Sequence, residues 1–193
     1  TEPKRLFDCL QYHLERKPLP NMLAAKENGQ WRTYSTQEVK DTVDKLSAGL
    51  YNLGVRCGDM TAGNRDKITI LTKTRLEWVM LDLAVKQTGA VLTPIYPTIN
   101  TADLEFVLVD AHVKIVFVND EDLFHKVLSV RDRVPSLQQI FTFEQVSGAN
   151  HWSEVLQQAD DAALAQVRAV AEKIQYEDLV TIIYTSGTTG TPK

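Results

Sequence analysis

The sequence has few cysteines and no run of basic residues. The first feature argues against a zinc or disulfide framework, and the second argues against a nucleic-acid-binding protein. Its 193 residues contain two cysteines, Cys9 and Cys57, without the spacing of zinc ligands. Two isolated thiols in a chain of this size favour a reducing compartment over a disulfide framework. The formal net charge is -4, and no run of Lys and Arg reaches five residues. We therefore expect no nucleic-acid partner.

Long apolar stretches are also missing. None approaches the ~20 residues that a membrane-spanning helix needs, and the longest candidate, 79–85, contains Asp82. The first residues, Thr1 to Arg5, lack the apolar core of a signal peptide. We expect a cytoplasmic protein without a transmembrane segment. The sequence leaves peripheral membrane association and oligomeric state open.

Several common catalytic and nucleotide-binding patterns are absent. There is no Walker A loop and no G-x-G-x-x-G fingerprint. No Ser, His and Asp residues are spaced so as to nominate a triad, so no catalytic residue is predicted within the chain. The four histidines are scattered, and we interpret them as surface or core residues: His13, His112, His125 and His151.

The first third of the chain carries strong local signals. Helical spacing of apolar residues predicts an N-terminal helix that ends before Pro18. Asn28-Gly29 lies between two strand-like segments, 22–27 and 30–34, and predicts a β-hairpin. The segment from Ser35 to Glu38 is a capping box, which predicts the start of the next helix.

Beyond residue 67 apolar runs alternate with amphipathic stretches. The runs predict strands at 67–72, 90–93, 114–118, 137–143 and 179–184, with helices between them. This alternation is typical of an α/β fold with a mainly parallel sheet. We predict a doubly wound sheet with helices on both faces, plus the N-terminal helix and hairpin. Residues 93–98, stiffened by Pro94 and Pro97, either wall a pocket or form a rigid connection with Tyr96 in the core.

The last ten residues, 184–193, combine hydroxyl side chains, two glycines and a final lysine. Gly lets the backbone approach an anion and offer its N–H groups. Hydroxyls add short hydrogen bonds and Lys adds a positive charge. The string follows a predicted strand, and ligands of parallel sheets sit beyond the carboxyl ends of strands. A plain Ser/Thr/Gly linker is the alternative.

Residues 185–193, Thr-Ser-Gly-Thr-Thr-Gly-Thr-Pro-Lys, resemble at every position the phosphate-loop signature of the adenylate-forming superfamily. Upstream segments look like those of long-chain acyl-CoA synthetases, namely 53–59, 74–78 and 89–98. The resemblance extends from about Trp31 to Lys193. Leu76 stands where that family usually has Pro, and 61–67 looks like a short insertion.

The resemblance implies the N-terminal part of an adenylation domain over residues 1–193, truncated at the phosphate loop. It also implies activation of a long-chain fatty acid by ATP and transfer of the acyl group to coenzyme A, with Mg²⁺ bound partly by Thr185. The predicted ATP phosphate-binding residues are Thr185, Ser186, Gly187, Thr188, Thr189, Gly190, Thr191 and Lys193.

The adenine, acyl and coenzyme A contacts of the family lie mostly downstream of this segment. We therefore expect the chain to be a fragment of a longer enzyme and to be inactive alone. The alternatives are a freestanding nucleotide- or anion-binding module, a degenerate structural domain, and an enzyme that adenylates another acyl or aryl acid.

Overall fold

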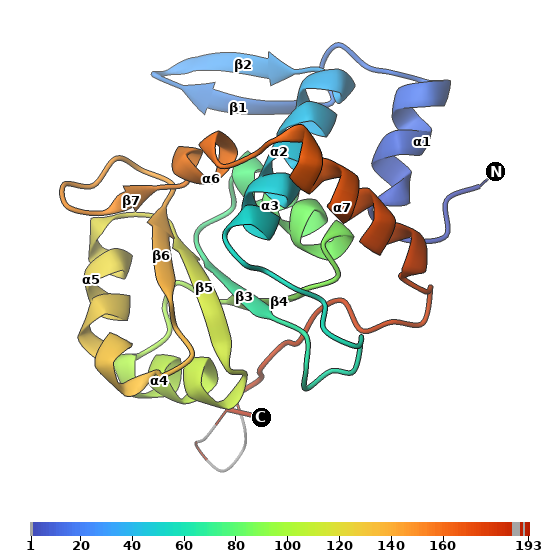
Figure 1. The fold of residues 1–193 in the computed structure, drawn as a ribbon. Helices are drawn as coiled ribbons and strands as arrows, with labels where there is room; N and C mark the ends of the chain where they lie inside the picture. The colour runs from blue at the N-terminus through green and yellow to red at the C-terminus, as the bar shows by residue number, and fades with distance from the viewer. Residues whose placement is uncertain (1, 187–189, 191) are drawn as a thin grey trace. The chain divides into compact units, whose positions relative to one another are not determined.

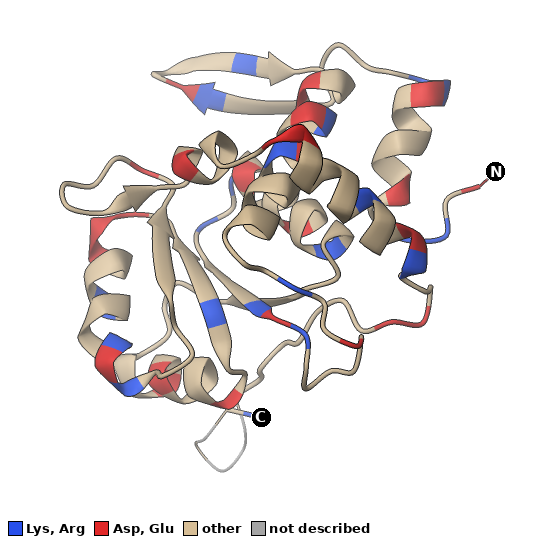
Figure 2. Ribbon diagram, viewed as in Figure 1, with Lys and Arg blue, Asp and Glu red and all other residues tan. Residues whose placement is uncertain are grey.

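The structure is a computed structural model that describes residues 2–186, 190, 192 and 193. Contacts divide it into two compact units, each built from separated stretches of chain. The first comprises Thr1–Arg56, Thr74–Gly89 and Val155–Asp178, and the second comprises Cys57–Lys73, Ala90–Glu154 and Leu179–Lys193. Lys and Arg are interspersed with Asp and Glu along the helices (Figure 2). No helix among the described residues is long and apolar enough to cross a membrane.

The first unit is helical apart from one hairpin (Figure 1). Its elements are α1 (Asp8–Arg16), β1 (Leu23–Glu27), β2 (Gln30–Tyr34), α2 (Thr36–Asn52), α3 (Leu76–Gln87), most of α6 (Ser153–Gln157) and α7 (Asp161–Lys173).

Local sequence signals fix the hairpin and the start of α2. Strands β1 and β2 pair antiparallel around Asn28 and Gly29, whose φ angles of 51° and 81° are those of a tight hairpin turn. At α2, the Glu38 N–H donates to the Ser35 hydroxyl over 3.1 Å, and the Ser35 N–H donates to the Glu38 carboxylate over 2.7 Å. The predicted hairpin and capping box are confirmed.

Gly49 lies in the buried part of α2, although glycine is a poor helix former. A Cβ atom at this position would lie 1.9 Å from the backbone oxygen of Val155. The close approach of α6 to α2 within the first unit therefore requires glycine.

Gly49→Ala should lower the free energy of unfolding by about 1–3 kcal/mol, because overpacking outweighs the better helix propensity of alanine. Denaturant unfolding would measure the change. Lys45→Ala, at an exposed position of the same helix, is the control and should stay within ~0.5 kcal/mol of the parent. A stabilised Gly49→Ala variant would contradict the packing shown here.

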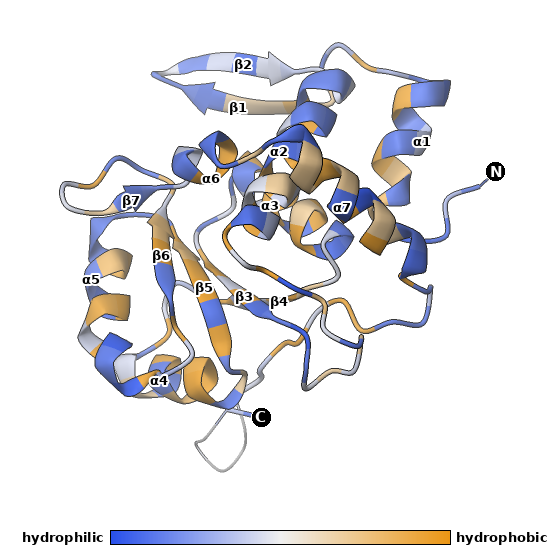
Figure 3. Cartoon of the chain, in the orientation of Figure 1, coloured by the Kyte–Doolittle hydropathy of each residue, from blue (hydrophilic) through white to orange (hydrophobic). Residues whose placement is uncertain are grey.

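The second unit is built on a parallel five-stranded sheet in the order β4-β3-β5-β6-β7. Its elements are β3 (Lys67–Leu71), β4 (Val91–Ile95), α4 (Thr101–Asp110), β5 (Val113–Val118), α5 (Glu121–Val130), the short 3₁₀ helix η1 (Arg131–Arg133), β6 (Gln139–Thr142) and β7 (Asn150–His151). Every residue of β3 is buried, and much of β5 is strongly hydrophobic (Figure 3). Strands buried on both faces need such continuous apolar runs.

Helices α4 and α5 pack on this sheet through a cluster of buried side chains. The cluster includes Leu104, Val107 and Leu108 of α4, Leu123, Phe124 and Val127 of α5, and Leu71, Val116 and Val118 of the strands. The predicted α/β class, with a parallel sheet flanked by helices and a separate hairpin, is confirmed.

The predicted strand at 179–184 is wrong as a full strand. The segment forms one isolated parallel bridge, between Leu92 of β4 and Thr181. Leu92 donates its N–H to Val180 and accepts from the N–H of Ile182. The next donor in this parallel ladder would be the backbone nitrogen of residue 94, and Pro94 has no N–H. The apolar run indicated a strand, but proline stops the pairing after one residue.

Candidate functional site

The structure describes half of the predicted phosphate-binding residues. Those described are Thr185, Ser186, Gly190 and Lys193. The other predicted residues lie outside the described residues: Gly187, Thr188, Thr189 and Thr191.

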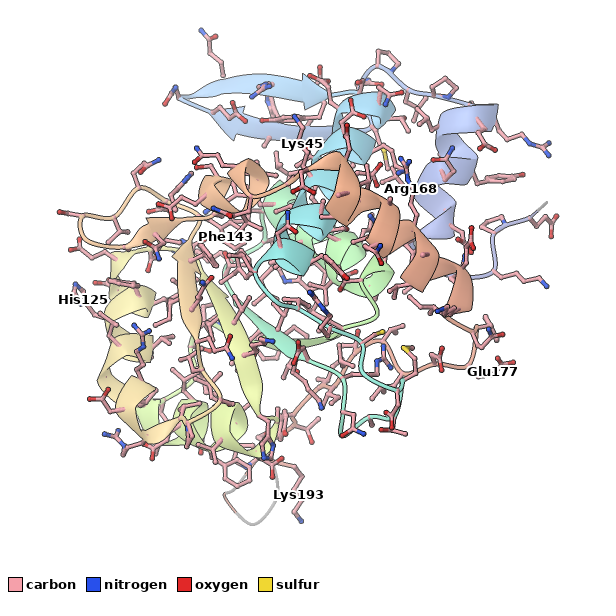
Figure 4. The ribbon with its side chains drawn as sticks, viewed as in Figure 1. Lys45, His125, Phe143, Arg168, Glu177 and Lys193 are labelled. Atoms are coloured by element: carbon pink, nitrogen blue, oxygen red, sulfur yellow. The ribbon has the colours of Figure 1, made fainter. Side chains whose placement is uncertain are left out.

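The first and last residues of the predicted loop are brought together. The Thr185 N–H donates to the Lys193 carbonyl over 2.9 Å, and the Lys193 N–H donates to the Thr185 carbonyl over 3.0 Å. This reciprocal pair closes the segment into a loop with a defined neck. Gly190 has a φ of 85°, a conformation that favours glycine. Lys193 is exposed, and its side chain projects away from the ribbon (Figure 4).

A pocket of about 220 Å³ adjoins this neck, within the second unit. On one side it is lined by the end of β4, the chain that follows it and α4, and on the other by residues at the two ends of the loop. Its lining residues are Pro94, Ile95, Tyr96, Thr98, Ile99, Asp103, Val107, Ile183, Tyr184, Thr185, Ser186 and Pro192. The pocket therefore begins where the ladder between β4 and residues 180–182 ends.

Residues 93–98 were expected either to wall a pocket or to be a rigid connection with Tyr96 in the core. Tyr96 is 79% exposed, so the core alternative is wrong for this side chain. Pro94, Ile95, Tyr96 and Thr98 all line the pocket. Lys126 of α5 donates to the Ile99 carbonyl over 2.9 Å, which holds the end of this segment.

Tyr184 is the residue of the site that sequence reasoning missed. It precedes the loop, packs against the cluster of α4 and α5, and donates its hydroxyl to the Asp110 carboxylate over 2.5 Å. Burial raises the pKa of the Tyr184 phenol, and the hydrogen bond to Asp110 and its negative charge raise that pKa further. Nothing in the sequence pairs residues 110 and 184.

A second polar group lies at the carboxyl edge of the same sheet. Thr72, after β3, donates to the side-chain oxygen of Asn119 over 2.7 Å. The Asn119 amide nitrogen donates to Asp120 over 3.1 Å and to Glu144, after β6, over 3.3 Å. These groups satisfy one another, so we interpret them as a connection between the ends of β3, β5 and β6.

Among the described residues no histidine or cysteine lines this pocket, although the His112 ring lies 3.1 Å from the Asp110 carbonyl oxygen. His13, His112 and His125 are exposed, whereas His151 is half-buried and hydrogen-bonds the Phe143 carbonyl over 2.9 Å. This agrees with their interpretation as surface or core residues. Both cysteines are free thiols.

Among the described residues, no three side chains of His, Cys, Asp or Glu gather as metal ligands. Thr185 offers one neutral hydroxyl oxygen at the loop neck. Mg²⁺ in nucleotide sites is held by few protein ligands, several waters and the substrate phosphates. A single hydroxyl oxygen such as that of Thr185 fits a site of that kind.

Raising the pH should test the contact between Tyr184 and Asp110. A phenol whose pKa is raised by folding adds stability that is complete below its ordinary pKa of 10.0 and is lost as pH rises through the higher folded value. In a titration followed by phenolate absorbance, the parent should contain one phenol whose pKa lies above the ordinary value. Tyr184→Phe should lack that phenol. Asp110→Asn should lower the pKa of that phenol. An unchanged pKa of the Tyr184 phenol in Asp110→Asn would contradict the contact.

A model of the AMP-binding enzyme family matches residues 11–193. The long-chain-fatty-acid–CoA ligase FadD15 of Mycobacterium bovis is 30% identical over 86% of this chain and 26% of its own length. Long-chain-fatty-acid–CoA ligase ACSBG2 of Xenopus laevis is 26% identical, over 89% of this chain and 23% of its own. The chain thus spans about a quarter of the length of these curated relatives.

Solved structures share the fold. The anthranilate CoA ligase AuaEII, in complex with anthranoyl-AMP, matches all of this chain and 34% of its own, with a TM-score of 0.78 and 22% identity. A long-chain-fatty-acid-CoA ligase (FadD1) from Archaeoglobus fulgidus matches all of this chain and 36% of its own, with a TM-score of 0.70 and 21% identity. The resemblance to adenylate-forming enzymes inferred from the loop is confirmed.

Proposed function

This chain belongs to the AMP-binding enzyme family, and we propose that its loop from Thr185 to Lys193 holds the phosphates of ATP during activation of a carboxylic acid. The observation that carries the proposal is the pairing of Thr185 with Lys193, which forms a closed loop from a sequence rich in hydroxyls and glycine. The loop follows the carboxyl end of the segment that bridges to β4, where ligands of parallel sheets bind.

In the proposed reaction, a carboxylate oxygen attacks the α-phosphorus of ATP, and the bond to the β-phosphate oxygen breaks. Pyrophosphate leaves and an acyl-adenylate forms. The sulfur of coenzyme A then attacks the acyl carbon and AMP leaves, while the thiol proton passes to solvent. The first step requires positioning and stabilisation of negative charge on the departing phosphates.

The loop residues supply both requirements. Backbone N–H groups and the hydroxyls of Thr185, Ser186, Thr188, Thr189 and Thr191 would donate hydrogen bonds to the β- and γ-phosphates. Lys193 would place a positive charge beside them. Mg²⁺, when bound, neutralises phosphate charge, and Thr185 would be its ligand from this chain.

We propose a long-chain fatty acid as the substrate, because curated relatives named for that substrate match most of the chain. An aryl acid is the second candidate, since the anthranilate CoA ligase shares the fold. Pyrophosphate exchange with oleate and with anthranilate, assayed in the complete enzyme that carries this sequence, distinguishes them. Binding of ATP without exchange by either acid would favour the nucleotide-binding module.

The chain by itself should release no AMP from ATP, oleate and coenzyme A. It spans about a quarter of the ligases that it resembles, and reactant positioning contributes about 7–11 kcal/mol to such reactions. An AMP-release assay would measure this. Turnover by the 193-residue chain at the rate of the complete enzyme would show that the remaining segments are dispensable.

In the complete enzyme, Lys193→Ala and Thr188→Val should each slow ATP–pyrophosphate exchange. A hydrogen bond to a charged group contributes about 1.5–3 kcal/mol, which corresponds to roughly ten- to a hundredfold in rate. Thr188→Val keeps the side-chain shape and removes only the hydroxyl.

The second half-reaction provides the control for both variants. Preformed acyl-adenylate with coenzyme A should give the thioester at nearly the parental rate, because the β- and γ-phosphates have already left. Parental exchange rates in both variants would refute the assignment of the loop.

A further inference from the structure

We propose that Tyr184, held by Asp110, is a positioning residue for the phosphate loop. It sets where the chain enters the loop and thereby places the loop's donors on the phosphates. The inference rests on the function proposed above, but its evidence is a different contact, between α4 and the residue before Thr185.

Backbone pairing does not fix the loop entrance. The ladder with β4 is confined, among the described residues, to the bridge at Leu92 and Thr181. Pro94 cannot donate the next bond, and Ile183 is 64% exposed. Thus two residues before the loop begins, neither the sheet nor the core holds the chain firmly.

The side chain of Tyr184 holds the chain at the entrance of the loop. Its ring packs against the cluster shared by α4 and α5, and its hydroxyl reaches Asp110 over 2.5 Å. The next residue, Thr185, pairs with Lys193. The neck of the loop is therefore fixed at consecutive residues, first to α4 through the Tyr184 side chain and then to its own far end.

The place of Asp110 supports the assignment. It is the last residue of α4, and a negative charge at a helix C-terminus is disfavoured by the helix dipole. Helix formation alone therefore gives no reason for a carboxylate there, whereas a hydrogen bond to the Tyr184 phenol does. A charged acceptor also makes this bond stronger than one between neutral groups.

Kinetics of the complete enzyme test the proposal with Tyr184→Phe, Asp110→Asn and the double variant. Tyr184→Phe keeps the ring against the cluster of α4 and α5 and removes only the hydroxyl. Each single variant should lower kcat/KM for ATP in pyrophosphate exchange by about tenfold, since small misplacements of binding groups are costly. The double variant should be no worse than either single variant, because both remove the same hydrogen bond. Tyr176→Phe, at an exposed tyrosine of the first unit, is the matched control and should behave as the parent.

Thioester formation from preformed acyl-adenylate separates positioning from a general loss of folding. A positioning role leaves this step at the parental rate, whereas a merely structural role lowers both steps by one factor. Equal loss in both steps, or parental exchange in both single variants, overturns the inference. Lys193→Ala is assayed alongside: if it is impaired while Tyr184→Phe and Asp110→Asn are not, this inference alone fails. Parental exchange by both Lys193→Ala and Thr188→Val removes the proposed function and this inference with it.

Discussion

The missing N–H of Pro94 is the constraint on which the candidate site depends. A parallel ladder that continued past Leu92 and Thr181 would need a donor at residue 94. Because proline cannot supply it, the pairing ends, and the residues after each segment line a pocket of about 220 Å³. The loop neck adjoins that pocket. A residue that would be a defect in a central strand thus creates, at the edge of this sheet, room beside a loop suited to phosphate.

The rest of the second unit supplies rigidity to this edge. Strand β3 is fully buried between β4 and β5, and Asn119 joins the ends of β3, β5 and β6 through its side-chain amide. Helix α4 carries Asp110 to the phenol of Tyr184. A loop that must place several donors on one ligand is best held by such elements, because their side chains and backbone lose little further freedom on binding. The ligand proposed for this loop, the phosphates of ATP, is consistent with the loop's composition and with membership of the AMP-binding family.

Sequence patterns predicted well the features whose partners are close along the chain. The turn at Asn28-Gly29 and the cap at Ser35 involve residues within a few positions of one another, so their chemistry is decided locally. The alternation of apolar runs also predicted the parallel sheet, since buried strands need apolar side chains on both faces. The strand prediction for 179–184 was wrong because apolar side chains indicate burial, whereas backbone pairing depends on the N–H donors of the neighbouring strand. Pro94 was visible in the sequence, but its position opposite this segment was not.

The sequence by itself determined the chemistry of the loop: its hydroxyls, its glycines and Lys193 are properties of residue type and order. It also determined the α/β class through hydrophobic periodicity. Only the tertiary structure decided that Thr185 pairs with Lys193, that α6 approaches α2 closely at Gly49, and that Asp110 meets Tyr184 across 74 positions of sequence. Such contacts depend on how the whole chain turns back on itself. Periodicity shows which face of an element is buried, but it does not identify the side chain that the face will meet.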